Sequence, residues 1–321
     1  IFDKLYNMSE VGGPMFENYL RNAMGLLMSD VEEIPTVIDI PRIFSNRDYL
    51  KKKLAKCPDP LIIEFWEKQA LQVSKGQDLS LENVTPYITS KFTSFISNDY
   101  MRPIIAQKKS TINFRKIMDE QKILLVNLAK GKIGDLNSSL LGLMIVGKLL
   151  MAAFSRVELP EEERKDFYLY IDEFQNFTTP SITTILSEAR KYRLDLIISH
   201  QFIAQLQDKI REAIFGNVGN MVVFRVGVKD AEFLVKQFEP VFNENDMINL
   251  DNFVAIAKLL VKNIPTRSFT MKTLPPPQGN SEIAKLLKEY SRLTYGTPRG
   301  LIEQEIREKY QKESEDLLEM E

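Results

Sequence analysis

The first third of the chain shows the spacing of apolar side chains that is typical of amphipathic α-helices. Stretches 47–55, 60–71 and 82–96 place apolar residues three or four positions apart, and prolines separate several of these stretches. The clearest stripe consists of Phe16, Tyr19, Leu20, Ala23, Leu26 and Leu27. We therefore predict an all-α domain over residues 1–110.

Residues 111–275 follow a different pattern, in which short, uninterrupted apolar runs alternate with helical segments. The runs are 122–128, 167–171, 194–199, 221–226 and 253–261. Continuous apolar strands separated by helices are typical of a mostly parallel sheet that is covered on both faces. The pattern predicts an α/β domain. The apolar segment 139–154, which Lys148 interrupts, is interpreted as a buried helix and not as a membrane span.

The two ends of the chain carry further signals. The proline-rich stretch "LPPPQG" at 274–279 predicts a linker, and we interpret residues 276–321 as this linker followed by a polar helical tail. At the other end the chain opens on Ile1, without a methionine or a charged and apolar leader. We therefore expect the sequence to be a fragment that lacks its true start.

Composition narrows the classes of function. The chain has 42 Lys and Arg against 44 Asp and Glu, so its net charge of −2 gives no general signal for nucleic acid. Cys57 is the only cysteine, which excludes an internal disulfide and fits a reducing compartment. His200 is the only histidine, which argues against metal sites and catalytic triads that depend on histidine.

Polar residues follow three of the predicted strands at the point where each strand ends. Asp172 and Glu173 follow the first, His200 and Gln201 the second, and Arg225 the third. In an open parallel sheet, ligands bind at the carboxyl ends of the strands. Carboxylates, a polar sensing group and an arginine are the groups that phosphoryl transfer needs. The other reading of an apolar run followed by two carboxylates is an ordinary surface turn.

Three segments in this order resemble one family. "FYLYIDEFQNF" (167–177), "LSEARKYRLDLIISHQ" (186–201) and "FGNVGNMVVFRVGVKDAEFL" (215–234) are similar to the Walker B strand, the helix and sensor, and a later strand of the HerA/FtsK superfamily. The nearest branch is the TraG/TraD-like type IV coupling proteins of conjugation and secretion. Segments 126–142 and 291–299 resemble bacterial members of the same branch.

The resemblance implies a RecA-like P-loop NTPase core that uses ATP and Mg²⁺, with residues 1–110 as an inserted all-α domain and 111–275 as the C-terminal part of the core. It implies a homo-hexamer that moves DNA without regard to sequence, with relaxase or secretion-channel proteins as partners. The phosphate loop G-x-x-x-x-G-K-[S/T] is absent from the sequence. We expect it upstream, together with a membrane anchor that would hold the protein at the cytoplasmic face.

The resemblance also suggests roles for single residues. Asp172 would hold the Mg²⁺ water shell, Glu173 would be the catalytic base, and Gln201 would be the glutamine that follows the sensor strand. Arg190 or Arg225 would reach the nucleotide of a neighbouring subunit. The alternatives are a solvated helix-end cation for Arg190 and a structurally paired charge inside a strand for Arg225.

Positive charge is concentrated between residues 101 and 134. The segment holds eight Lys or Arg and two acidic residues, which gives +6. A basic band suits phosphate tracking, although such a run is also common on a solvated face. We predict DNA contact at Lys108, Lys109, Arg115 and Lys116.

Three functions remain open at this point. The first is an ATP-driven DNA translocase of conjugation and type IV secretion, of which this fragment alone would be inactive. The second is a HerA-like translocase that acts in DNA repair. The third is a scaffold module that keeps the fold without hydrolysing ATP. A phosphate loop upstream would favour a motor, and transmembrane helices upstream would favour secretion.

Overall fold

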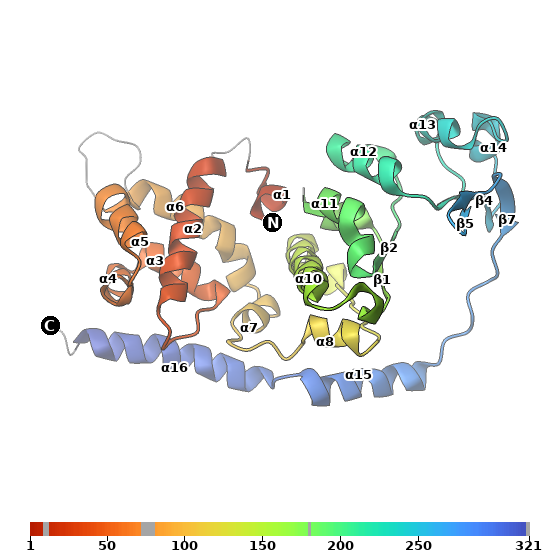
Figure 1. The fold of residues 1–321 in the computed structure, drawn as a ribbon. Helices are drawn as coiled ribbons and strands as arrows, with labels where there is room; N and C mark the ends of the chain where they lie inside the picture. The colour runs from red at the N-terminus through yellow and green to blue at the C-terminus, as the bar shows by residue number, and fades with distance from the viewer. Residues whose placement is uncertain (9–12, 72–80, 179–180, 319–321) are drawn as a thin grey trace. The chain divides into compact units, whose positions relative to one another are not determined.

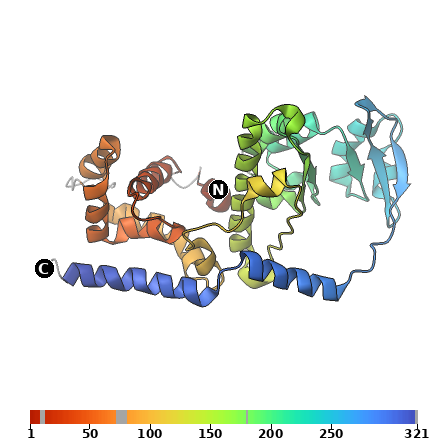
Figure 2. The same cartoon turned by 60° about the horizontal axis from the view of Figure 1, so that its bottom comes forward.

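The computed structural model describes residues 1–8, 13–71, 81–178 and 181–318 of the chain and divides into two compact units. The helical unit comprises residues 1–113, 126–142 and 286–321, and the α/β unit comprises residues 114–125 and 143–285. Figures 1 and 2 show the elements of both units from two directions. The chain passes between the units several times, so each unit is assembled from segments that are far apart in the sequence.

Every described element of residues 1–113 is a helix, as the apolar spacing predicts. The helices are α1 (Phe2–Tyr6), α2 (Gly13–Ser29), η1 (Val37–Asp39), α3 (Ile40–Ser45), α4 (Arg47–Lys56), α5 (Pro60–Glu64), η2 (Phe65–Ala70), α6 (Leu81–Ile96) and α7 (Met101–Ile105). The later segments add α9 (Lys130–Ile133) and α16 (Arg299–Leu318), and α15 (Ser281–Tyr295) leads into α16. The last two helices lie in the region that the sequence identifies as a polar tail.

The core of the helical unit is built from the apolar stripes of α2, α3 and α6 and from the aromatic residues Phe65 and Trp66 at the start of η2. Trp66 and Phe92 are fully buried, and the α2 stripe lies inside the unit except for Leu20, which is half-buried. Side chains that precede two of the helices fix where they begin. Asn46 accepts hydrogen bonds from the first backbone N–H groups of α4, and Asp59 does the same for α5.

The described part of the α/β unit contains seven short strands, with helices before and between them. The strands are β1 (Phe167–Ile171), β2 (Leu194–Ile198), β3 (Met221–Val223), β4 (Val254–Lys258), β5 (Leu260–Val261), β6 (Ile264–Pro265) and β7 (Phe269–Lys272). The helices are α8 (Phe114–Asp119), η3 (Arg156–Glu158), η4 (Glu161–Glu163), η5 (Phe174–Phe177), α11 (Ser181–Glu188), η6 (Ala189–Tyr192), η7 (Ile203–Gln205), α12 (Asp208–Asn217), α13 (Val228–Phe238) and α14 (Glu244–Ile248). Helix α10 (Asp135–Ser155) starts in a segment of the helical unit and belongs to the α/β unit from residue 143 on.

The sheets differ from the predicted, mostly parallel sheet. Among the described strands only β1 and β2 are parallel, whereas β3, β4 and β7 form an antiparallel sheet with β4 at its centre, and β5 and β6 form a hairpin. Apolar runs predict that strands are buried but not their direction, and the β5–β6 hairpin reverses the chain before β7. The predicted strand at 122–128 is irregular, with Ile123 and Leu125 more than four-fifths exposed.

The apolar helix α10 contributes Leu143, Leu149 and Ala153 to the protein interior, while Lys148 is exposed. Among the described residues, 135–158 is the one helical stretch with the length and hydropathy of a membrane span, and half of its most apolar window is buried. A partly buried helix of this kind is also common in the core of soluble proteins.

Candidate active site at the ends of strands β1 and β2

Strands β1 and β2 run side by side in parallel and end together. Ile171 is opposite Ile198, and the backbone pairing continues past both strands, because Ser199 donates to Ile171 O at 3.0 Å and Phe174 donates to Ser199 O at 2.9 Å. The residues that follow β1 therefore meet those that follow β2. This arrangement brings Asp172, Glu173 and Gln201 together, as the strand-end pattern predicts.

Asp172 is exposed and is held by two hydrogen bonds. The hydroxyl of Ser199 donates to Oδ1 at 2.6 Å, and the backbone N–H of Glu173 donates to the same oxygen at 3.0 Å. No hydrogen bond to Oδ2 is found within the part of the chain that the structure describes. The two hydrogen bonds thus fix the Oδ1 side of the carboxylate.

Glu173 is held by amides from both sides. Gln201 Nε2 donates to Oε1 at 2.5 Å, and Gln175 Nε2 donates to Oε2 at 2.6 Å. The backbone of Glu173 is left-handed, with φ 49° and ψ 46°, a conformation that is uncommon for residues other than glycine. Backbone conformations of this kind cluster at functional sites.

The segment after Glu173 explains how this turn is held. Residues Phe174–Phe177 form the short helix η5, in which Phe174 is fully buried and Phe177 nearly so. The two phenyl groups anchor the helix, so Gln175 between them stays within reach of Glu173. Ser199 and Gln175 were not singled out from the sequence, although Ser199 directly follows β2 and could have been found from the strand register.

His200 lies half-buried beside the site. Burial lowers its pKa, and the nearby carboxylate of Asp230 opposes that shift. Its Nδ1 is buried without a hydrogen-bond partner in the described part of the protein. Asp230 itself accepts a hydrogen bond from the backbone of Ile203, which follows Gln201 closely. Burial therefore favours the neutral form of the imidazole.

The two candidate arginines lie away from this cluster. Arg190 is exposed in the turn Ala189–Tyr192 before β2, whereas Gln201 follows β2. The strand between them spans roughly 16 Å at about 3.3 Å per residue. Arg225 is exposed and donates to Asn252 Oδ1 at 3.4 Å. Strand β3 ends at Val223, so Arg225 follows the strand. The alternative from the sequence, a charge inside the strand, is therefore wrong.

The predicted DNA-binding residues fall into two groups. Lys108 and Lys109 are exposed in the loop after α7 of the helical unit. Arg115 and Lys116 belong to α8 of the α/β unit and have acidic partners, Asp119 at 2.5 Å and Glu120 at 3.5 Å. The basic band is therefore partly neutralised, and Lys108 and Lys109 are its more accessible positions.

Arg156 is a structural cation that the sequence did not reveal. It is fully buried after α10, donates to the backbone oxygens of Tyr192 at 2.9 Å and of Lys165, and lies 3.4 Å from Asp119 Oδ1. Lys165 and Tyr192 precede β1 and β2. One guanidinium group therefore ties together the amino ends of the two strands whose carboxyl ends form the site.

Comparison with known proteins finds one family model and several solved structures. Residues 166–237, which contain β1, β2 and the site, match the family model described as the TraM recognition site of TraD and TraG. No curated protein matches the chain. The plasmid coupling protein TrwB with the GTP analogue GDPNP is 14% identical, with a TM-score of 0.47, over 83% of this chain and 70% of TrwB. TrwB with ADP and Mg²⁺ gives 14% and 0.46 over the same shares.

An unbound form of TrwB is 15% identical, with a TM-score of 0.42. The match covers 75% of this chain and 66% of the TrwB chain. The fold is helix-rich α/β, and Asp172, Glu173 and Gln201 gather at the carboxyl ends of the parallel strands β1 and β2. The match over 166–237 contains these residues and is to a segment of the coupling proteins TraD and TraG.

Proposed function

We propose that this chain is part of an ATP-driven motor that moves DNA in conjugation or type IV secretion. The observation that carries the proposal is the strand-end cluster, in which Ser199 fixes Asp172 and Gln201 contacts Glu173. A nucleotide ligand is suggested by structures of TrwB, which include complexes with ADP and Mg²⁺ and with nucleotide analogues.

The residues present fit Mg²⁺ and the phosphates of ATP. Mg²⁺ prefers oxygen ligands and is usually bound through one or two carboxylates, water and substrate phosphates. Asp172 offers an exposed carboxylate oxygen of this kind, next to the Ser199 hydroxyl. When bound, the ion would neutralise charge that develops on the phosphates. The described residues contain no cluster of three or more side chains that could hold a metal ion.

Glu173 would act as the base in this reaction. Its carboxylate would take a proton from the attacking water, and Gln201 would move its amide from Glu173 to a phosphate oxygen when nucleotide is present. The sequence lacks a G-x-x-x-x-G-K-[S/T] loop, so these residues alone do not supply the phosphate-binding part of the site. Tests of hydrolysis therefore require the complete protein.

The experiment that tests this function is the substitution Glu173→Gln. The amide has the same shape but cannot take the proton, so nucleotide binding should remain while turnover falls by about 10²–10⁴-fold. Glu162→Gln, the same substitution at an exposed position of η4, is the control. If Glu173→Gln hydrolyses ATP at the wild-type rate, the cluster is an ordinary surface turn.

The wider assembly follows from the same proposal. We propose a homo-hexamer that contacts DNA without reading its sequence, through Lys108 and Lys109. The family description names recognition of TraM over 166–237, and we extend this to a relaxosome or secretion-channel partner for the present chain. An upstream anchor would hold the motor at the cytoplasmic face of the membrane.

A further inference from the structure

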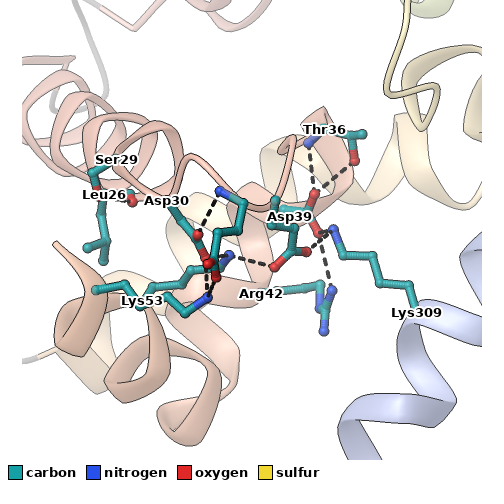
Figure 3. Close-up of polar contacts among 11 residues, drawn as sticks. Leu26, Ser29, Asp30, Thr36, Asp39, Arg42, Lys53 and Lys309 are labelled. Carbon is teal, nitrogen blue, oxygen red and sulfur yellow. Dashed lines mark hydrogen bonds and ion pairs between the residues drawn. The ribbon is translucent and has the colours of Figure 1, made fainter.

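The helical unit contains a buried cluster of charges where the segment between α2 and α3 meets α4 (Figure 3). Lys53 of α4 is 1% exposed and lies 2.8 Å from Asp30 and 2.6 Å from Glu33. Asp39 is fully buried and accepts hydrogen bonds from Thr36 N at 2.8 Å and from Arg42 at 3.2 Å. Buried charges need partners, because an unpaired one costs several kcal/mol.

Helix α16 supplies one member of this cluster from the other end of the sequence. Nζ of Lys309 lies 2.8 Å from Glu33 Oε1 and 2.8 Å from Asp39 Oδ1, and its side chain is only 12% exposed. The next residue, Tyr310, places its ring 4.2 Å from the guanidinium carbon of Arg42. Two consecutive residues of α16 therefore enter the cluster, and Figure 3 shows Lys309 reaching it from the helix.

The ion pairs of the cluster extend to α16. The carboxylates are the buried Asp30 and Asp39 and the half-buried Glu33, and two buried cations of α3 and α4, Arg42 and Lys53, pair with them. At the rim, Lys56 lies 2.7 Å from Glu32 and 3.5 Å from Asp30. Lys309 contacts both Glu33 and Asp39, so its removal takes a cation away from each of these two carboxylates.

Apolar packing contributes less to the seating of α16. Among its side chains that the structure describes, from Arg299 to Gln311, Ile302 is the one that is buried and apolar. Helix α15, which precedes α16, has no buried residue. Besides the buried Ile302 and the half-buried Ile306, α16 is held by Lys309 and Tyr310, so few of its side chains contribute to its attachment.

We propose that Glu33 and Asp39 form a binding site for the Lys309 side chain, here called the socket. Helix α16, here called the strap, binds the helical unit through this site and can detach from it. The seated and released states of α16 form a two-state element. Any molecule that binds one state better shifts this equilibrium, and by linkage it changes the state of the socket. The C-terminal helix would thus transmit binding events to the helical unit. This inference does not depend on ATP hydrolysis.

The test compares the intact 321-residue chain with Lys309→Met, which keeps the length of the side chain and removes its charge. Hydrogen exchange in residues 299–311 reports the strap. Thiol labelling of Cys57, the only cysteine and 8% exposed in the core of the helical unit, reports unfolding of the domain. Lys288→Met on the exposed face of α15 is the matched control.

We expect Lys309→Met to accelerate exchange in 299–311 at least tenfold while Cys57 labelling stays at the wild-type rate, and Lys288→Met to change neither. Unchanged exchange in α16 overturns the proposal. A parallel rise in Cys57 labelling also overturns it, because α16 would then be an integral part of the core. If the variant does not fold, the same two measurements are made on the wild-type chain in low denaturant. A detachable α16 should then exchange its amide hydrogens at a lower denaturant concentration than the one at which Cys57 becomes reactive.

Discussion

The hydroxyl of Ser199 donates a hydrogen bond of 2.6 Å to Oδ1 of Asp172 and so links the ends of β2 and β1. A partner that orients a metal-binding carboxylate typically contributes 10–100-fold to metal affinity. We expect Ser199→Ala in the complete protein to raise the Mg²⁺ concentration for half-maximal ATP hydrolysis by about 10–100-fold. The rate at saturating Mg²⁺ should change little.

The control for this prediction is Ser199→Thr, which keeps the hydroxyl and should stay within a few fold of wild type. A Mg²⁺ titration of ATPase activity gives the answer. An unchanged Mg²⁺ requirement in Ser199→Ala, in an otherwise active protein, would show that the contact with Asp172 has no part in holding the ion.

Part of the site could be predicted because strand ends are visible in the sequence. Apolar runs that end before Asp172 and before Gln201 imply that the residues after the two strands meet when the strands are parallel neighbours, and Gln201 does contact Glu173. The contact of Gln175 with Glu173 could not be predicted, because it depends on a left-handed turn that the sequence does not signal at a glutamate. Its discovery required the backbone.

The fold shows the same division between local and long-range information. Helical periodicity predicted an all-α region over residues 1–110, where every described element is a helix, and the buried stripe of α2 follows this periodicity. The antiparallel direction of β3, β4 and β7 depends on connections, and apolar runs do not encode direction. The ion pair of Lys309 with Asp39 joins segments at opposite ends of the sequence, so no local pattern could signal it.

Arg156 should dominate the stability of the α/β unit. Replacing it with methionine leaves the carbonyls of Lys165 and Tyr192 and the carboxylate of Asp119 without their buried donor. Each buried acceptor that is left without its donor typically costs about 1–3 kcal/mol, and Asp119 keeps Arg115 as a partner. We expect a loss of about this size in the free energy of unfolding, measured by hydrogen exchange of the amides in β1 and β2.

The control for Arg156 is Arg193→Met, which removes an exposed ion pair with Asp166 at 3.5 Å. Exposed pairs contribute about 0–1 kcal/mol, so this variant should resemble wild type. Equal effects of the two substitutions would contradict the structural role of Arg156.

The charge cluster predicts how the helical unit responds to acid. Burial acts to raise the pKa of Glu33, but hydrogen bonds and charges from Lys309 and Lys53 outweigh it and lower the pKa from 4.5 to about 2. A carboxylate whose pKa is lower in the folded state stabilises the fold above its unfolded pKa. This contribution is present above pH 4.5 and should be lost as the pH falls towards 2.

Urea unfolding followed by the fluorescence of Trp66, which is buried in the same unit, measures this dependence. Glu33→Gln should flatten the decline between pH 4.5 and 2. The decline should not vanish, because the pKa of Asp30 is also lowered: burial raises it, but the hydrogen bond and charge of Lys53 dominate. An identical pH profile in wild type and Glu33→Gln would mean that Glu33 does not ionise as the structure implies.

The position of Arg190 before β2 predicts action across a subunit interface. Within one chain the length of β2 separates Arg190 from Gln201 and the carboxylates, so Arg190 could contribute only to the site of a neighbouring subunit. An arginine that reaches a neighbour's phosphate can contribute 10³–10⁵-fold to the rate, and lysine does not reproduce its planar fork. In the complete protein, Arg190→Lys should assemble normally and lose roughly this much activity. Lys191→Met, at the adjacent exposed position, is the control and should retain activity.

Mixing two inactive variants tests whether Arg190 acts in trans. When Arg190→Lys subunits exchange with Glu173→Gln subunits, some interfaces combine an intact Arg190 from one chain with an intact Glu173 from the next. ATPase activity measured against mixing ratio should then rise above that of either variant and peak at intermediate ratios. If confirmed subunit exchange gives no rescue at any ratio, action across the interface is contradicted. Full activity of Arg190→Lys alone would remove this residue from the site and leave Arg225, which is exposed after β3, as the candidate.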